Sequence, residues 1–216
     1  MLDYKKAFLD LALKHDVLRF GSFTLKSGRV SPYFFNLGRI SSGAALRDLG
    51  RAYAAAITAQ GLAFDMLFGP AYKGIPLAAA VAIALAETTG RDVPFAYNRK
   101  EAKDHGEGGV MVGADTVRRR ILIVDDVLTA GTALREAHGL LTASGAVPIA
   151  AITALDRQEI SASGRSAAAE ASEKLGLSIM SLVTVRDLLE YLQASGGDPL
   201  TVSAIESYQA LYGVPA

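Results

Sequence analysis

Hydrophobic and polar positions along the chain form segments of two kinds, which together indicate an α/β fold. Short, continuously apolar runs are typical of parallel strands buried on both faces, and longer segments with apolar positions three or four apart are typical of helices. A strand, a loop and a helix follow one another at 65–87 and again at 121–143. This repeated unit predicts a mainly parallel sheet flanked by helices.

The remaining segments extend the same pattern. An amphipathic helix is predicted at 1–16, and short strands with bends follow at 20–38, where aromatic and turn-forming residues are frequent. Neither an internal repeat nor a long linker divides the 216 residues, so we expect a single domain spanning 1–216. The other predicted elements are helices at 41–61, 75–87, 131–143, 185–195 and 201–213, strands at 65–69, 93–98, 118–126, 146–157 and 177–185, a charged loop at 99–109, and a loop with a weakly packed helix at 158–176.

Composition narrows the function. Lys plus Arg and Asp plus Glu each total 22, and this zero net charge argues against a nucleic-acid-binding protein, whose domain is usually basic. The absence of cysteine excludes disulfides and thiolate ligands, and three scattered histidines argue against a structural zinc site. No apolar run reaches the ~20 residues of a membrane helix, and the amino terminus lacks a secretory apolar core. We therefore expect a soluble, cytoplasmic protein.

Three loops are expected to meet at one edge of the sheet. In open α/β sheets, ligands bind outside the carboxyl ends of the strands. The loops "GPAYKGIP" (69–76) and "DDVLTAGTA" (125–133) both follow strands, so they should line one crevice. Arg157, at the end of the next predicted strand, should reach the same edge.

The stretch "ILIVDDVLTAGTA" (121–133) joins two acids to a loop suited to an anion. Backbone N–H groups at a helix amino terminus, with the hydroxyls of Thr129 and Thr132, suit a phosphate monoester. Asp125 and Asp126 would repel that phosphate, but carboxylates accept hydrogen bonds from the vicinal hydroxyls of a sugar. The stretch therefore predicts a ribose 5-phosphate site. It matches neither the P-loop nor the dinucleotide fingerprint, and the alternative is a strand end with a simple helix cap.

The same stretch resembles the phosphoribosyl-diphosphate (PRPP) motif of type I phosphoribosyltransferases. "FTLKSGRVSPYFFN", "GPAYKGIP", "RKEAKDHGEGG" and "ALDRQE" occur in the order and spacing of the orotate phosphoribosyltransferases, and this likeness covers essentially the whole chain. The resemblance implies an α/β fold with a small N-terminal hood, built mainly from about residues 1–40 plus the C-terminal segment, and a mobile lid loop at 99–109. It also implies transfer of phosphoribosyl from PRPP to N1 of orotate, with Mg²⁺ held mainly by PRPP and water rather than by protein side chains.

The resemblance assigns roles to individual residues. It implies a homodimer, in which the lid reaches the neighbouring site, and a peptide bond Ala71–Tyr72 that is cis. Catalysis would involve Lys26, Lys103, His105 and Asp126. Orotate would be bound by Lys26, Phe34, Phe35, Thr129 and Arg157. PRPP would be bound by Tyr72, Lys73, Arg99, Lys100, Lys103, His105, Asp125, Asp126, Val127, Leu128, Thr129, Ala130, Gly131, Thr132 and Ala133.

Simpler interpretations of these residues stay open. Lys26 is also what a surface turn would carry, two adjacent phenylalanines are common in a core, and Arg157 could form an ordinary salt bridge. The lid could be a plain solvated loop. For the whole chain, the competing hypotheses are a purine phosphoribosyltransferase and a PRPP-sensing regulator without catalysis. A purine offers no carboxylate to Arg157, and a nucleic-acid regulator should show a basic face, so we expect PRPP and orotate as ligands, with no nucleic acid or membrane.

Overall fold

A computed structural model of the chain describes residues 1–25, 27–103, 109–128, 131–161 and 164–215, with only the backbone at 102 and 103. In this part of the chain, six strands form the central sheet in the order β5-β4-β3-β6-β7-β8. Neighbouring strands are parallel except at one edge, where β5 runs antiparallel to β4. The prediction of a mainly parallel sheet is confirmed. The strands are β3 (Met66–Gly69), β4 (Phe95–Lys103), β5 (Gly109–Gly113), β6 (Arg120–Val124), β7 (Val147–Asp156) and β8 (Ser178–Thr184).

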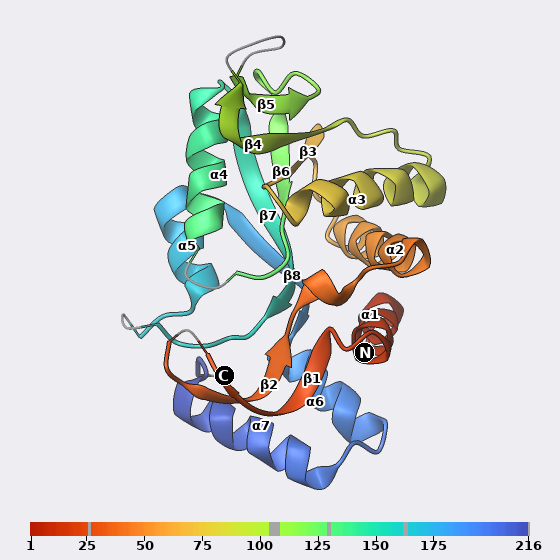
Figure 1. Ribbon diagram of the computed structural model, residues 1–216, viewed down its shortest axis with the longest axis vertical. Coiled ribbons are helices and arrows are strands. Elements are labelled where there is room, and N and C mark those ends of the chain that lie inside the picture. Colours follow the sequence, from red (N-terminus) through yellow and green to blue (C-terminus); the bar gives the residue numbers. More distant parts are fainter. Residues whose placement is uncertain (26, 104–108, 129–130, 162–163, 216) are drawn as a thin grey trace.

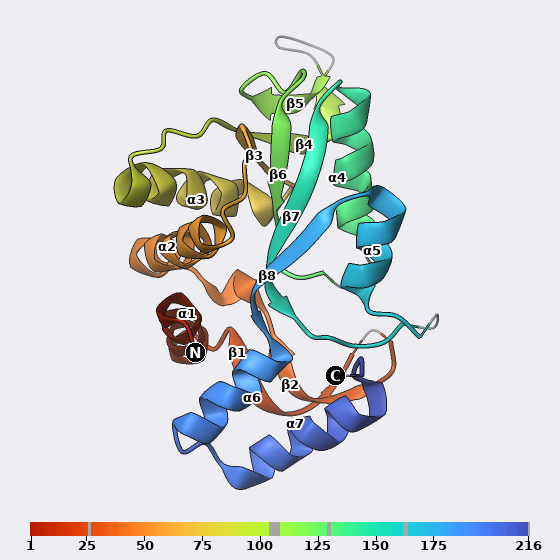
Figure 2. The ribbon, with the colours of Figure 1, turned by 180° about the vertical axis from the view of Figure 1, so that it is seen from behind.

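Helices cover both faces of this sheet. Figures 1 and 2 show α1, α2 and α3 on one face and α4 and α5 on the other. Successive strand residues serve the two faces in turn: Leu67 and Leu122 belong to the core that includes α2 and α3, whereas Met66 and Ile121 belong to the core that includes α4. The helices are α1 (Asp3–Lys14), α2 (Gly43–Ala59), α3 (Gly74–Thr89), α4 (Thr132–Ala143) and α5 (Ala167–Leu175).

A second, smaller layer lies at one end of the molecule. β1 (Leu18–Thr24) and β2 (Val30–Phe35) pair antiparallel in a separate two-stranded sheet. α6 (Val185–Ala194) and α7 (Pro199–Tyr212) lie at the same end, and α7 packs against β2 (Figure 1). The amino-terminal and carboxyl-terminal segments therefore meet beside the end of β7, where the hood is expected.

The structure differs from the sequence prediction at 99–109. We expected a loop throughout, but 99–103 continue β4, and Gly109 begins β5, which the sequence analysis did not predict. Lys103 is paired with Gly109 across these strands. Charged residues are tolerated because this hairpin forms the edge of the sheet, where side chains reach water. Residues 104–108 lie outside the described residues.

No helix in the described ranges is both long enough and apolar enough to cross a membrane.

Candidate active site

The loops that follow β3, β6 and β7 lie side by side, because these strands are neighbours in the sheet. Hydrogen bonds tie the ends of β6 and β7 together: Asp125 N–H donates to Ile152 O at 3.0 Å, and Ala154 N–H donates to Asp126 O at 2.8 Å. The acid pair therefore lies close to the carboxyl end of β7, which Arg157 follows. The three loops that were expected at one edge of the sheet therefore lie next to one another there.

Asp125 is the more enclosed member of the acid pair. Its carboxylate accepts a hydrogen bond from Asp126 N–H at 2.8 Å, and its backbone carbonyl accepts one from the hydroxyl of Tyr53, at 2.9 Å. Burial, followed by the charge of Asp126, raises the pKa of Asp125 from 3.8 to about 6.

Asp126 faces the loop that follows β3. Lys73 Nζ lies 2.6 Å from Asp126 Oδ2, with 54% of the lysine side chain and 18% of the aspartate side chain exposed. This ion pair joins the two loops across the sheet edge. It places a cation beside the acid pair, where a ligand with both hydroxyl and phosphate groups would meet both charges.

The loop after β3 is compact because two glycines allow it. A Cβ on Gly69 would lie 2.0 Å from the carbonyl oxygen of Gly74, and one on Gly74 would lie 2.6 Å from Pro70 Cδ. The Ala71–Tyr72 peptide bond is cis, as the resemblance implied. Because α3 begins at Gly74, the loop presents the positive end of that helix to the crevice.

Side chains from β4 reach the same loop. Asn98 Oδ1 accepts a hydrogen bond from Ala71 N–H at 2.9 Å. Lys100 Nζ lies 5.3 Å from the ring centroid of Tyr72, which is 68% exposed. Arg99 Nη1 donates to Gly109 O at 3.4 Å, across the hairpin. Lys100, in the segment that the resemblance assigns to a lid, therefore contacts the loop that follows β3.

The anion loop after β6 leads directly into α4. Gly131 adopts the left-handed conformation that glycine favours, with φ 70°, and α4 starts at Thr132. Arg135 Nη2 donates to the hydroxyl of Thr132 at 3.0 Å, which leaves the hydroxyl hydrogen of Thr132 available to a phosphate oxygen. Ala133 is exposed in the first turn of α4, and Val127 bridges to Leu155 of β7.

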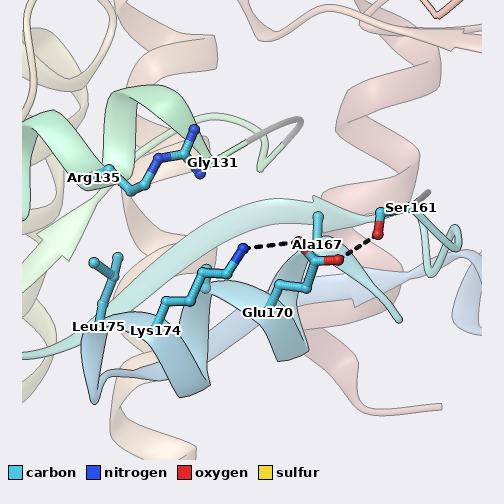
Figure 3. A pocket seen from close by; sticks show the side chains of 8 residues that line it. Gly131, Arg135, Ser161, Ala167, Glu170, Lys174 and Leu175 are labelled. Atoms are coloured by element: carbon cyan, nitrogen blue, oxygen red, sulfur yellow. Dashed lines mark hydrogen bonds and ion pairs between the residues drawn. The ribbon is translucent and has the colours of Figure 1, made fainter. Parts of the chain in front are cut away.

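Behind this loop, a cavity of about 160 Å³ separates the start of α4 from α5 (Figure 3). Gly131 and Arg135 line it from α4, opposite Glu170 and Lys174 of α5. Lys174 Nζ is 3.6 Å from a Glu170 oxygen, and the hydroxyl of Ser161 donates to Glu170. Of the predicted site residues that the structure describes, Gly131 alone lines this cavity.

Arg157 lies in a polar cluster between β7, β2 and α7. Its Nε donates to Glu159 Oε1 at 2.6 Å and its Nη2 donates to Ser31 Oγ at 3.0 Å. The guanidinium carbon lies 4.3 Å from the ring centroid of Tyr33. The salt bridge of the simpler interpretation is therefore present, between Arg157 and Glu159. Only 13% of the Arg157 side chain is exposed, and these contacts hold it at the carboxyl end of β7.

The two adjacent phenylalanines of β2 point in different directions. Phe35 packs with Phe8 against the main core, at a centroid distance of 6.2 Å. Phe34 packs with Phe23 at 5.5 Å, and the guanidinium of Arg19 lies 5.7 Å from its ring. The core interpretation therefore holds for Phe35, while Phe34 packs against Phe23 and Arg19.

Some predicted site residues lie outside what the structure describes. They are Lys26, His105, Thr129 and Ala130, together with the side chain of Lys103. Leu128 is described and packs partly buried against the core beneath α4.

Comparison with known proteins agrees with this geometry. A family model for the phosphoribosyl transferase domain matches residues 37–169, more than half of the chain. The orotate phosphoribosyltransferase of Cellvibrio japonicus is 55% identical over 214 residues, which make up 99% of this chain and 99% of that protein. The chain belongs to the orotate phosphoribosyltransferase family.

Solved structures of the same kind share the fold. The orotate phosphoribosyltransferase of Francisella tularensis is 40% identical, with a TM-score of 0.86 over 95% of this chain and 98% of its own. The UMP synthase of Leishmania donovani is 26% identical, with a TM-score of 0.76 over 97% of this chain and 41% of its own. The family resemblance and the fold expected from the sequence are thus both confirmed.

Sequence reasoning missed several residues that shape this orotate phosphoribosyltransferase site. Glu159 lies within the quoted motif "ALDRQE", so its position two residues after Arg157 was a usable signal. Tyr53 and Asn98 gave no such signal. Each looks like an ordinary member of its helix or strand, and its contact depends on how distant segments pack.

Proposed function

We propose that the chain transfers the 5-phosphoribosyl group of PRPP to N1 of orotate, giving orotidine 5′-monophosphate and pyrophosphate, in pyrimidine biosynthesis. Its family membership supports the activity, and the geometry of the crevice supports the residue roles. The observation that carries those roles is the meeting of the Asp125–Asp126 pair, the Lys73 loop and Arg157 at one edge of the sheet.

The acid pair and its two flanking loops would hold PRPP. Asp125 and Asp126 accept hydrogen bonds from the ribose hydroxyls, each charge-assisted bond contributing about 1.5–3 kcal/mol. The 5-phosphate lies on the loop from Val127 to Ala133, at the amino terminus of α4. Pyrophosphate lies on the loop of Tyr72 and Lys73, so the Lys73–Asp126 ion pair spans the bond that breaks.

Orotate would lie between this edge and the hood. Arg157 takes the orotate carboxylate, for which a guanidinium fork is suited. A purine lacks that carboxylate, which speaks against the purine enzyme as the alternative. Phe34 and Phe35 contribute through the shape and backbone of β2, since Phe35 directs its side chain into the core.

The chemistry needs positioning and electrostatics more than covalent catalysis. Orotate N1 attacks ribose C1 as pyrophosphate leaves, with positive charge growing on C1 and negative charge on the leaving group. Asp126 faces the positive charge, and Lys26, Lys73 and Lys103 face the negative charge. Arg99, Lys100 and His105 of the lid add positive charge over pyrophosphate, and a proton on His105 could be transferred to a pyrophosphate oxygen.

We expect Mg²⁺ to be carried by the substrate rather than held by protein side chains. No group of three or more His, Asp or Glu within the described ranges is arranged to hold a metal, and Asp126 is already paired with Lys73. Mg²⁺ prefers phosphate oxygens and water, and when bound it neutralises negative charge on pyrophosphate. The protein side chains would orient PRPP around it.

A homodimer, a lid that serves the neighbouring site and a cytoplasmic location remain predictions that rest on the family resemblance and the sequence. A regulator without catalysis is the second candidate of another class. The chain's zero net charge argues against regulation through nucleic acid.

One assay separates these functions. Purified protein is mixed with PRPP and Mg²⁺, and with orotate, adenine or hypoxanthine in turn, and consumption of the base is followed. Of the three bases, we expect only orotate to be consumed, and we expect its consumption to stop when Mg²⁺ is chelated. Turnover with a purine but not with orotate would refute the proposal, and no turnover with any base would favour the regulator.

A further inference from the structure

Glu159 is the centre of a polar cluster that joins Arg157 to the carboxyl-terminal helix α7. Its Oε1 accepts hydrogen bonds from Arg157 Nε at 2.6 Å and from the hydroxyl of Tyr208 at 3.1 Å. Its Oε2 accepts one from Arg29 Nη1 at 3.4 Å. Only 17% of the Glu159 side chain is exposed, so a nearly enclosed carboxylate is shared by the hood, the end of β7 and α7.

The contacts of Arg157 leave one side of its guanidinium for a ligand. Nε is taken by Glu159, one hydrogen of Nη2 is taken by Ser31, and the ring of Tyr33 lies against the guanidinium. The hydroxyl of Tyr208 also interacts with the guanidinium, and no hydrogen bond from Nη1 to a described residue has ordinary geometry. Nη1 and the remaining hydrogen of Nη2 are the donors with which Arg157 would bind a carboxylate.

The negative charge of Glu159 offsets one of the two positive charges in this cluster. Arg29 and Arg157 both contact it, so the three side chains together carry one net positive charge. Without the carboxylate, two guanidiniums would share a half-buried site and Arg157 Nε would lose its acceptor. Arg157 would then turn toward other acceptors or toward water, because a buried donor without a partner is unfavourable.

The carboxyl-terminal segment fixes the same stretch through its backbone. Gln209 Nε2 donates to Arg157 O at 3.2 Å, and Ile160 N–H donates to Tyr212 O at 2.8 Å. Val214 N–H donates to Gln158 O at 2.8 Å. Arg157 is thus held from α7 both through Glu159 and through its own carbonyl group.

We propose that Glu159 is a positioning residue that orients the outer edge of Arg157 toward the carboxylate of the base, and that α7 sets this preference through Tyr208. The inference rests on the proposed function, in which Arg157 binds the orotate carboxylate. It adds that selection of a carboxylate-bearing base depends on a segment about fifty residues further along the chain, at Tyr208.

The test compares Glu159→Gln with wild type. Glutamine keeps the shape and one acceptor oxygen but removes the charge. We expect KM for orotate to rise about tenfold and KM for PRPP to stay within about twofold, because only the binding of the base depends on Arg157. The preference for orotate over uracil, which lacks the carboxylate, should fall by a similar factor in kcat/KM.

A matched control is Glu206→Gln. Glu206 lies on α7, is exposed and accepts from Gln193 at 3.1 Å, so its carboxylate is removed from the same helix without touching Arg157. It should leave both KM values unchanged. If Glu159→Gln does not fold, Tyr208→Phe tests the same proposal, because it removes the hydrogen bond that the Tyr208 hydroxyl donates to Glu159. This variant should raise KM for orotate about threefold and leave KM for PRPP unchanged.

A double-mutant cycle with Arg157→Ala separates the binding role of Arg157 from the positioning role of Glu159. If Arg157→Ala leaves KM for orotate unchanged, the proposed role of Arg157 is wrong. If Arg157→Ala raises it and Glu159→Gln adds nothing further in that background, Glu159 acts through Arg157 as proposed. Equal changes in KM for both substrates, no change in either, or full additivity with Arg157→Ala would overturn the positioning role while the proposed function stands.

Discussion

Replacing Asp125 with asparagine should stabilise the fold at neutral pH while it greatly lowers activity. Asp125 has a pKa of about 6 in the folded chain against an ordinary value of 3.8, chiefly because it is buried and then because Asp126 is close. A higher pKa in the folded state means that the protonated form is favoured by folding. The resulting stabilisation is present below about pH 4 and is lost as the pH rises through 6.

The size of this effect follows from the two pKa values. Each pKa unit corresponds to about 1.36 kcal/mol, so a difference of about two gives a limit near 3 kcal/mol. Water reaches part of the side chain, so we expect about 1–2 kcal/mol in practice. Asparagine carries no charge and can keep the acceptor for Asp126 N–H, so Asp125→Asn should escape this loss of stability.

Urea unfolding at pH 4, 5, 6 and 7 measures the difference directly. Asp125→Asn should match wild type at pH 4 and become more stable by about 1–2 kcal/mol at pH 7. Phosphoribosyl transfer should fall by about 100-fold or more, because the proposed acceptor of a ribose hydroxyl loses its charge. A stability difference that stays constant from pH 4 to 7, or an asparagine variant less stable at pH 7, would refute the burial argument.

Three further predictions concern other parts of the crevice. Lys73→Met should raise KM for PRPP about tenfold with little effect on KM for orotate, because it removes the cation 2.6 Å from Asp126; equal changes in both constants would contradict this assignment. Gly69→Ala should lower the free energy of unfolding by about 2–4 kcal/mol, since its Cβ would meet Gly74 O, whereas Gly43→Ala, with open space around it, should be nearly neutral in the same urea titration. If the chain forms a homodimer whose lid serves the neighbouring site, mixing the Arg157→Ala and Lys103→Ala proteins should restore some activity; failure after confirmed subunit exchange would indicate self-contained sites.

Much of this arrangement could be predicted from local patterns. The strands at 66–69 and 121–124 are continuous apolar runs, and the acid pair marks a strand end, so the meeting of these loops follows from the fold rule alone. The continuation of β4 to Lys103 could not be predicted, because charged residues at 99–103 resemble a loop until β5 pairs with them. Local patterns cannot show such pairing, which depends on a partner further along the chain.

The polar cluster around Arg157 shows the same limit. The motif "ALDRQE" located the arginine, but its acceptor Ser31 comes from β2 and Tyr208 comes from α7. Neither is marked by its neighbours in sequence. Contacts that join three distant segments depend on packing, and only the three-dimensional structure contains them.

A crystal structure of the protein with orotidine 5′-monophosphate tests the central claim most directly. We expect the orotate carboxylate within about 3 Å of Nη1 and Nη2 of Arg157, and the ribose hydroxyls at a similar distance from Asp125 and Asp126. The 5-phosphate should lie at the amino terminus of α4. A nucleotide bound with its carboxylate away from Arg157, or with its ribose away from the acid pair, would contradict the account.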